Sequence, residues 1–496
     1  MPARPNVSHT IQDPGIRSGR VPRSIGLVIG LTTAGVANQV GWYDNPAAAI
    51  AAHQDGPALE VALAMLAESG GPVGIMRMST SVAADNSAVS QDVGSGPLIT
   101  VAGSARYDHR CEIEITADGA LGAAKFRYNL DGFSGSTDAQ KSWSQEYTVP
   151  AGGSFAIPGT DLTLTFPAGT YNDGDIYSFT ADCAASNSSD LATAFTNIAA
   201  INRDFTFVTL VTTANTGDES AHATLAAAFN SELNTLAVAG MPLRGMMKAN
   251  IGNDDGAVAT AYTAVTAPRV LALFSDVATV VKHSFVGYKR PRGSALSSLS
   301  ARASAVRIST DLKRVESGPL PNIVEVFEDE RTAPTGLDDR YITTLTSQLG
   351  LGTPFVTQGR LKAAEGSDYR LWPRGIVMDR ICKIVFEEEQ RFIGMGLRFN
   401  AGPDVGDGLN AAGLTVGALD PRDIKRLEAR VNGRLRTEIM QQVNEEGELG
   451  HASGVIYRID PTHDVASTET IVSDVNGVPL VYPSYVNSTL GWGTDL

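Results

Sequence analysis

Residue types that bind metals or act as nucleophiles are sparse and widely separated in this sequence. Its seven histidines and three cysteines form no pair at the spacing of a zinc site, and no HExxH, DxDxDG or phosphate-binding P-loop run occurs. The Gly-Met-Gly turn at 394–396 lacks the third glycine and the preceding strand of a dinucleotide-binding motif. The consecutive glutamates at 387–389 point in different directions on a helix, which favours a solvated face over paired catalytic acids. We therefore expect no catalytic residue, no metal site and no cofactor.

Four arginines recur at every fourth position of the segment 421–443, which we predict to be one helix. They are Arg422, Arg426, Arg430 and Arg434. A stripe of aliphatic residues with helical spacing runs beside them, so the helix is amphipathic with a basic edge. Two interpretations stay open, a solvated helix face or a surface that docks onto an acidic protein. Nucleic acid is not expected, because no aromatic residues alternate with the arginines.

Two of the three cysteines are predicted to lie near each other in a β-rich segment. Alternation of apolar and polar residues puts Cys111 and Cys183 on the apolar faces of its first and last strands. Two interpretations stay open here as well, buried thiols or a disulfide within or between chains. The third cysteine, Cys382, falls on a predicted helix and is a candidate for an interface.

The composition describes a globular protein of more than one domain. The chain has 496 residues, of which 43% are hydrophobic, so it has ample material for several cores. Its net charge of −15 argues against binding to nucleic acid or to an anionic membrane, because both attract an excess of lysine and arginine. No apolar run reaches the roughly 18 residues of a membrane span.

The order of predicted elements indicates an α/β (α+β) multidomain fold with an insertion. Helices and strands alternate over residues 23–96 and 185–330, which predicts one discontinuous α/β domain. Between them, residues 97–184 alternate between polar and apolar and contain Asp-Gly turns, which is typical of an inserted all-β domain. Residues 331–477 predict a C-terminal α/β domain.

Periodicity predicts several helices in the second half of the chain. Two long helices are expected in the C-terminal domain, at 376–393 and 421–443. Two shorter helices are expected at 268–281 and 338–350.

Both ends of the chain have the composition of extended arms. Residues 1–22 are rich in proline and glycine turns and add nothing to a core. Residues 478–496 have apolar side chains but no second strand of their own, namely Leu480, Val481, Tyr482, Tyr485, Val486, Leu490 and Trp492. Their backbone groups stay unpaired unless they join the sheet of another chain. We therefore predict an inter-subunit arm at the C-terminal end.

Two blocks of sequence together resemble the contractile tail sheath proteins of bacteriophages and related injection machines. The N-terminal block, residues 22–78, contains SIGLVIGLTTAG followed by GGPVGIMRM, which is similar to the family's strand-loop-helix-helix-strand opening. The C-terminal block contains YRLWPRGIVMDRICKIV, the helix DPRDIKRLEARVNGRLRTEI and the strand SGVIYRID. A β-rich insertion between two α/β halves is likewise typical of this family.

The resemblance implies a structural protein and not an enzyme. Sheath subunits stack as rings, expected here to be hexameric, around an inner tail tube, and contraction drives the tube through the host cell envelope. The C-terminal domain would face the tube, the inserted domain would face outward, and both arms would reach neighbouring subunits by strand exchange. Arg422, Arg426, Arg430 and Arg434 would then bind the tube.

The resemblance also implies partners and a location. The partners are other sheath subunits, the tail tube protein, the baseplate and the tail terminator, with no nucleic acid and no membrane anchoring. The location is the tail sheath of a virion that is assembled in the host cytoplasm.

Two other functions stay open. The chain can belong to a bacterial contractile injection device, which sequence separates poorly from a phage tail. It can also be an extracellular adhesin or enzyme whose β insertion binds carbohydrate, with Trp143 and Tyr147 as the candidate aromatic residues. Stacking within the β core explains these two residues better.

Overall fold

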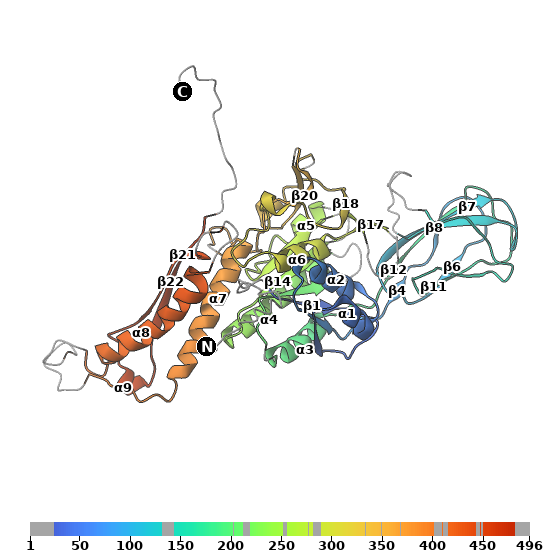
Figure 1. Ribbon diagram of the computed structural model, residues 1–496. Coiled ribbons are helices and arrows are strands. Elements are labelled where there is room, and N and C mark those ends of the chain that lie inside the picture. Colours follow the sequence, from blue (N-terminus) through green and yellow to red (C-terminus); the bar gives the residue numbers. More distant parts are fainter. Residues whose placement is uncertain are drawn as a thin grey trace, which may run out of the picture.

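The computed structural model describes residues 24–130, 143–201, 203–211, 219–250, 255–275, 277–280, 289–332, 334–348, 350–367, 369–400, 409, 415–442, 447 and 450–481. The molecule is elongated, with a central body of sheets and helices, a β-rich part at one end and two long C-terminal helices at the other (Figure 1). The predicted α/β class is thus confirmed as a mixed arrangement of sheets and helices. No helix in these segments is long and apolar enough to cross a bilayer.

A six-stranded sheet forms the centre of the body. Its order is β15-β14-β13-β1-β3-β2, and all neighbours are parallel except β3 and β2. The strands are β1 (Gly26–Gly30), β2 (Val40–Tyr43), β3 (Val73–Arg77), β13 (Phe207–Val211), β14 (Arg244–Asn250) and β15 (Val270–Phe274). Because β1 pairs with β13 in parallel, chain segments on both sides of the β-rich part build one sheet.

Two layers of helices cover this sheet. One layer holds α1 (Pro46–His53), α2 (Pro57–Ser69) and α6 (Leu296–Ala305), and the other holds α3 (Ser188–Ala199), α4 (Glu219–Val238) and α5 (Asp255–Ala261). Local signals set where the helices begin. Asn45 caps α1 directly before a proline, and Asn187 forms a capping box with Asp190 at the start of α3.

The chain between β3 and α3 forms two sheets with a core of their own. Their strands are β4 (Asp85–Asn86), β5 (Ser90–Val93), β6 (Thr100–Gly103), β7 (His109–Ala117), β8 (Lys125–Asn129), β9 (Tyr147–Thr148), β10 (Ser154–Ala156), β11 (Leu162–Thr165) and β12 (Ile176–Asp182). The larger sheet has the order β4-β12-β7-β8-β9 with β5 also on β12, and the smaller has β10-β11-β6. Buried aromatic residues such as Phe126 and Phe166 belong to this core. β4 and β5 lie before residue 97 and pair with β12. Strands of the β-rich part therefore occur before residue 97, the predicted start of the inserted domain.

The two cysteines of the β-rich part are buried but not adjacent. Cys111 on β7 lies opposite Phe179 of β12, whereas Cys183 follows the end of β12. Cys183 is four positions along the chain from Phe179, about 13 Å in an extended strand, which is well beyond the reach of a disulfide. Neither cysteine forms a disulfide within the chain, and the Cys183 thiol lies 3.1 Å from Asp108 Oδ1. Of the two interpretations left open by the sequence, the structure has buried thiols within the chain, because the strand register keeps the two cysteines apart. Cys382 is exposed on α7 (Trp372–Glu389).

Two predicted helices are strands in the structure. The segment 268–281 contains β15 and β16 (Val277–Val280), and β16 pairs with β17 (Lys289–Gly293) and β18 (Ile323–Val326). The segment 338–350 contains the 3-10 turn η3 (Asp338–Arg340) and β19 (Leu345–Gln348), which pairs with β20 (Gly352–Val356). Another 3-10 turn is η2 (Val315–Ser317). In a short run of apolar residues that is buried on both faces, hydrophobic residues show no periodicity that would distinguish a strand from a helix. This explains the wrong prediction at β15.

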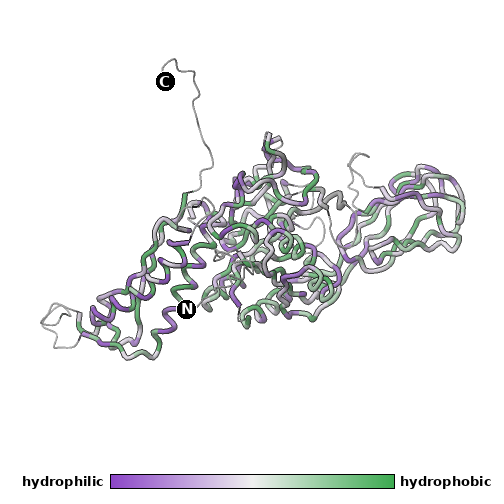
Figure 2. Tube along the Cα trace, in the orientation of Figure 1, coloured by the Kyte–Doolittle hydropathy of each residue, from purple (hydrophilic) through white to green (hydrophobic). Residues whose placement is uncertain are grey.

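The C-terminal part consists of two long helices and a hairpin. Besides α7, which ends in the 3-10 turn η4 (Gln390–Phe392), it contains α8 (Pro421–Leu435), which ends in the π-helical turn η5 (Arg436–Met440). The hairpin strands are β21 (Ala452–Ile459) and β22 (Ser473–Pro479), joined through α9 (Val465–Thr468). Hydrophilic and hydrophobic residues alternate along α7 and α8 (Figure 2). The two long helices predicted from periodicity are thus present with shifted ends.

The start of α7 is packed into the body. The ring of Trp372 meets that of Phe207 on β13 edge-on, with 5.8 Å between centroids. Asp379 accepts hydrogen bonds from Arg244 Nε at 2.7 Å and from Arg269 Nη1 at 2.9 Å. The C-terminal helices and one face of the body therefore share a single hydrophobic core.

Candidate assembly surface

The hairpin of β21 and β22 has one buried face and one exposed face. Tyr457 and Ile459 are buried against the helices, whereas Ile456 and Val478 are exposed on the opposite face. Within the described residues this sheet has only these two strands. Side chains of α8 occupy the outer edge of β21, because Asn432 and Glu428 bind the backbone groups of Tyr457 and Ile459. No strand of the described part lies beside the outer edge of β22. A two-stranded sheet is marginal on its own, and open edges are the usual sites of strand addition.

Residues 478–481, the last that the structure describes, belong to this hairpin or directly follow it. Val478 pairs with Gly454 and Pro479 with Ala452, so the strand extends past the predicted start of the arm at 478. The expectation that residues from 478 onward have no strand partner in their own chain is wrong for these two. Beyond them Leu480 is half-buried and Val481 is 82% exposed. The other predicted arm residues, Tyr482, Tyr485, Val486, Leu490 and Trp492, lie outside the described residues.

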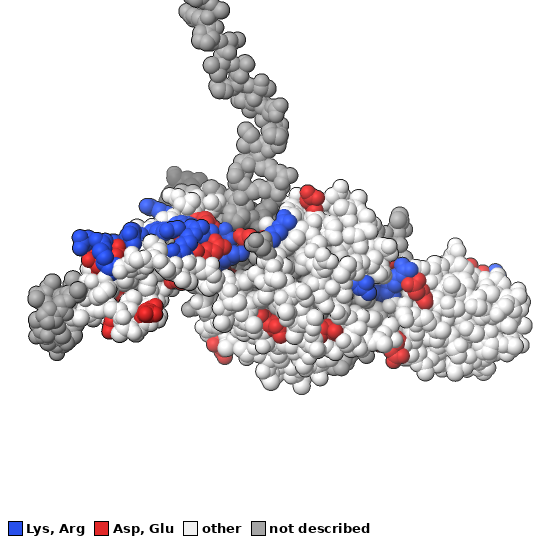
Figure 3. Space-filling model, turned by 90° about the horizontal axis from the view of Figure 1, so that it is seen from below, with Lys and Arg blue, Asp and Glu red and all other residues white. Residues whose placement is uncertain are grey.

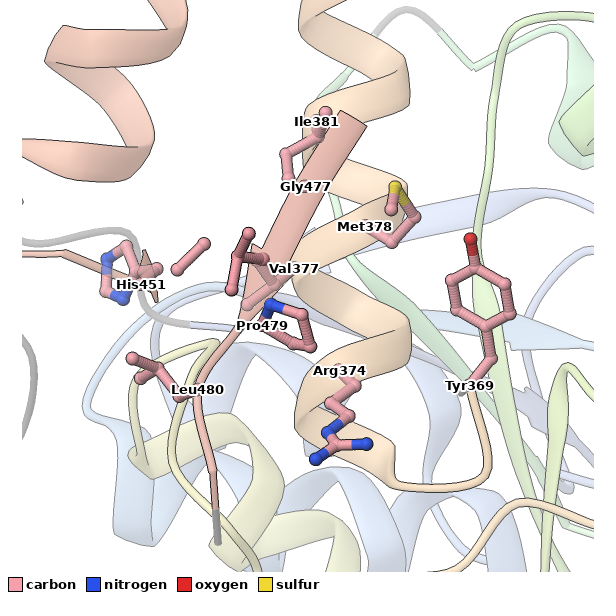
Figure 4. A pocket seen from close by; sticks show the side chains of 11 residues that line it. Tyr369, Arg374, Val377, Met378, Ile381, His451, Gly477, Pro479 and Leu480 are labelled. Carbon is pink, nitrogen blue, oxygen red and sulfur yellow. The ribbon is translucent and has the colours of Figure 1, made fainter. Parts of the chain in front are cut away.

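A cavity of about 150 Å³ lies between α7 and the end of the hairpin. Its walls come from both elements, including Met378 and Ile381 on α7 and Gly477 to Leu480 at the end of the hairpin (Figure 4). His451 forms one side of the cavity. Its Nδ1 atom is hydrogen-bonded to Ser309 Oγ at 2.7 Å. Burial, together with the nearby charge of Arg307, lowers the pKa of His451 to about 4. The cavity wall therefore has a neutral imidazole at ordinary pH.

The outer end of α8 is fixed by a buried aspartate. Asp423 accepts hydrogen bonds from the backbone N–H of Arg398 at 2.8 Å and from its guanidinium at 3.0 Å. Arg426 lies 3.4 Å from the same carboxylate. The hydrogen bonds and charge of Arg398 hold the pKa of Asp423 at about 2. This carboxylate is thus charged at any ordinary pH and ties α8 to the turn that follows η4.

The inner end of α8 is fixed by a buried glutamate on α7. Glu388 accepts hydrogen bonds from Arg430 Nε at 2.8 Å, Arg434 Nη1 at 3.2 Å and Arg391 Nη1 at 2.7 Å. Burial would raise the pKa of Glu388, but the bonds from Arg430 and Arg434 and the charge of Arg391 outweigh it and lower the pKa. The expectation that the glutamates 387–389 form a solvated face is therefore wrong for Glu388, whose side chain is only 3% exposed.

The four arginines of the basic edge are not equivalent. Their side chains are 76%, 55%, 44% and 25% exposed in the order Arg422, Arg426, Arg430 and Arg434. Arg434 also binds Glu387 and Glu438, both at 2.6 Å. Basic side chains gather on the part of the molecule that holds α7 and α8 (Figure 3). The inner arginines hold the two helices together, and the outer pair is the more exposed.

Sequence reasoning missed the carboxylates that organise this surface. Asp423 was an ordinary member of the charge pattern, and Arg398 belonged to no motif. The one local signal was the spacing of Glu388 and Arg391, three residues apart on a helix. The contacts from α8 to α7 bridge more than forty residues, which no local pattern reports.

The fold matches solved structures of contractile systems. No protein-family model matches the sequence, and no curated protein sequence matches it. A chain of the anti-feeding prophage baseplate in its contracted state matches with a TM-score of 0.50 and 12% identity, covering 100% of both chains. The contracted helical sheath of the anti-feeding prophage matches with a TM-score of 0.48 and 9% identity, covering 96% of this chain and 94% of that one. The sheath tail protein of Desulfitobacterium hafniense matches with a TM-score of 0.44 and 13% identity, covering 93% and 98%. The resemblance predicted from the sequence is thereby confirmed at the level of the fold.

Proposed function

We propose that this chain is the repeating subunit of a contractile sheath, which stacks as hexameric rings around an inner tail tube. Contraction drives the tube through the envelope of the target cell. One observation carries the proposal: among the described residues the outer edge of β22 has no strand beside it, and the hairpin is followed by the exposed Val481. The subunit thus offers both a place for an added strand and a segment that can supply one.

Strand exchange would link the subunits into a mesh. A segment that adds to the edge of β22 pairs its backbone groups and covers apolar side chains such as Val478. Residues 1–22 and the segment after Leu480 are the arms proposed to do this. Such links keep subunits connected while they slide, because the hydrogen bonds of an added strand stay within the sheet.

The outer arginines of α8 would hold the tube. The guanidinium groups of Arg422 and Arg426 are exposed, although their carboxylate partners Asp420 and Asp423 are not. Each exposed contact that these arginines make with a partner is worth roughly 0 to 1 kcal/mol. Many copies together make the attachment strong, and each contact still releases easily. Stored conformational energy would drive contraction, as subunits move from an extended lattice to one with better interfaces.

The proposed arrangement puts the C-terminal part, residues 331–477, against the tube. The discontinuous body, residues 23–96 and 185–330, would form the wall, and the β-rich part, 97–184, would face outward. A baseplate at one end and a tail terminator at the other would complete the particle. No catalytic step is proposed for any of these parts.

A bacterial injection device is the second candidate setting. It is favoured by the full-length match to a chain of the contracted anti-feeding prophage baseplate. The subunit would have the same mechanical role in that setting as in a phage tail.

The adhesin hypothesis has less support in the β-rich part. The guanidinium of Arg127 lies 4.5 Å from the ring centre of Trp143, and Tyr147 packs against Tyr128 and Phe155 with centroids 5.8 and 4.9 Å apart. Both candidate sugar-stacking rings are thus engaged by their own sheet.

Negative-stain microscopy of the purified protein tests the proposal. We expect long hollow cylinders. A population of dispersed 52.1 kDa particles under all assembly conditions would count against a sheath.

A further inference from the structure

The β-rich part and the body have separate hydrophobic cores. Among the residues that the structure describes, the core of the β-rich part shares no member with either core of the body. Charged groups of both signs lie together where the β-rich part meets the body (Figure 3). A joint without a common apolar core usually permits relative motion of the parts that it connects, because movement there exposes little apolar surface. The orientation of the β-rich part therefore depends on polar contacts.

The chain passes between the body and the β-rich part twice, and the two passages are hydrogen-bonded to each other. The backbone N–H groups of Val82 and Ala185 each donate to the other residue's backbone oxygen, both at 3.0 Å. Ser186 Oγ donates to the backbone oxygen of Ser79 at 2.7 Å. We call these two passages the neck. A connection of this kind can serve as a hinge, because changes in the backbone angles of a few residues turn the parts on either side.

A buried carboxylate of the body holds two neighbouring residues of the β-rich part. Asp55, in the turn between α1 and α2, accepts hydrogen bonds from Tyr107 Oη at 2.6 Å and from Arg106 Nη1 at 3.1 Å. The Asp55 side chain is only 9% exposed. Arg106 also pairs with Asp161 of the β-rich part at 2.5 Å, so its guanidinium group links a carboxylate from each side of the joint. We call the contacts of Asp55 with Arg106 and Tyr107 the latch.

The next residue along the chain contacts both the body and the neck. Asp108 Oδ2 lies 3.7 Å from Lys248 Nζ on β14, and both side chains are buried. The other carboxylate oxygen accepts a hydrogen bond from the backbone N–H of Cys183 at 3.1 Å, two residues before the neck. Three successive residues of the β-rich part, 106–108, thus carry polar contacts across the joint.

We propose that the latch holds the β-rich part in one orientation, and that this part turns as a rigid unit about the neck when the latch is open. The inference goes beyond the proposed sheath function and does not depend on it. Opening the latch exchanges hydrogen bonds within the chain for hydrogen bonds to water, which costs less than exposing a hydrophobic core. The core of the β-rich part stays closed during such a turn, because residues such as Ile113 and Phe126 are completely buried inside it.

Single-molecule energy transfer between two dyes tests the inference on dispersed full-length subunits. One dye is attached to Cys382, which is exposed on α7, and the other to Ser154→Cys, at an exposed position of β10. Cys111 and Cys183 are buried and therefore stay unlabelled. With the latch intact we expect one narrow distribution of transfer efficiency.

The latch variant is Arg106→Gln with Tyr107→Phe, which removes both donors of the latch. We expect it to show a broader distribution of transfer efficiency or a second population. The matched control is Arg127→Gln with Tyr128→Phe, which changes the same residue types at neighbouring positions, where the arginine pairs within its own sheet. The control should give the same distribution as the intact latch. A thermal melt verifies that both variants fold.

Three outcomes would overturn the inference. A latch variant whose distribution equals that of the control shows that the latch does not set the orientation. A broad distribution in the protein with an intact latch shows that nothing fixes the β-rich part. Loss of the near-ultraviolet circular dichroism signal in the latch variant shows that these contacts support folding and not orientation. If the latch variant does not fold, Asp55→Asn breaks the same contacts from the side of the body, and one narrow distribution for that variant contradicts the inference.

Discussion

Arg430 Nε on α8 lies 2.8 Å from Oε2 of Glu388 on α7, and this contact joins two residues 42 positions apart. Glu388 is buried, so the arginine is required to compensate a charge inside the subunit. A row of arginines that looks uniform in the sequence therefore divides into two pairs. Its inner half holds α7 to α8, and its outer half is the more exposed.

Glu388→Gln should destabilise the subunit. The substitution removes the charge that Arg430, Arg434 and Arg391 share, and leaves charge-assisted hydrogen bonds unmade. We expect a loss of about 2 kcal/mol in the free energy of unfolding, measured by urea denaturation. Glu365→Gln, at an exposed position, is the matched control and should change little. Equal stability of the two variants would show that the glutamate is dispensable.

His451 should make stability depend on pH between about 6.5 and 4. Its pKa is about 4 in the folded chain and ordinarily 6.5, so the unfolded chain binds the extra proton first as the pH falls. Stability is then complete above pH 6.5 and declines toward pH 4. His451→Asn should flatten this part of the profile of urea midpoint against pH, whereas His463→Asn, at a less buried position, should not. Identical slopes for the wild type and His451→Asn would refute the assignment.

Reversing the outer arginines should separate assembly from attachment. Arg422→Glu with Arg426→Glu changes exposed positions, so cylinders should still form while tube binding drops. Arg434→Glu should instead lower the melting temperature, because Arg434 binds three carboxylates of its own subunit. Microscopy, cosedimentation and thermal melts distinguish these outcomes. Tube binding that survives the double reversal would return Arg422 and Arg426 to a solvated face.

Ending the chain after Leu480 should abolish polymerisation and leave a folded subunit. The hairpin keeps all its own pairs, since β22 ends at Pro479. Circular dichroism should therefore remain unchanged while light scattering shows no growth of polymers. Normal polymerisation of the shortened chain would contradict the role given to the C-terminal arm.

The fold was predictable where local signals and long periodicity agree. Asp420 and Pro421 form a cap and first turn that place the start of α8, and its apolar stripe continues to Leu435. The prediction of a helix around Val270 was wrong, because a strand buried on both faces and a buried helix have the same kind of short apolar run. Pairing within the sheet decided between them, and pairing is not local.

The candidate surface was predictable only in part. The basic edge of α8 was recognised from the four-residue spacing of its arginines. The burial of Glu388 was not, because it depends on how α7 packs against α8. Only one strand of the hairpin was predicted from the sequence. The strand around Ile456 was expected, whereas the end of its partner strand β22 was assigned to the C-terminal arm. Contacts between distant segments therefore account for what the sequence did not reveal.

A cryo-electron microscopy map of the assembled protein tests the central claim most directly. We predict a strand from another subunit hydrogen-bonded to the outer edge of β22. A β22 edge that stays without a strand in the assembly, or that is paired with an end of its own subunit, would contradict the account.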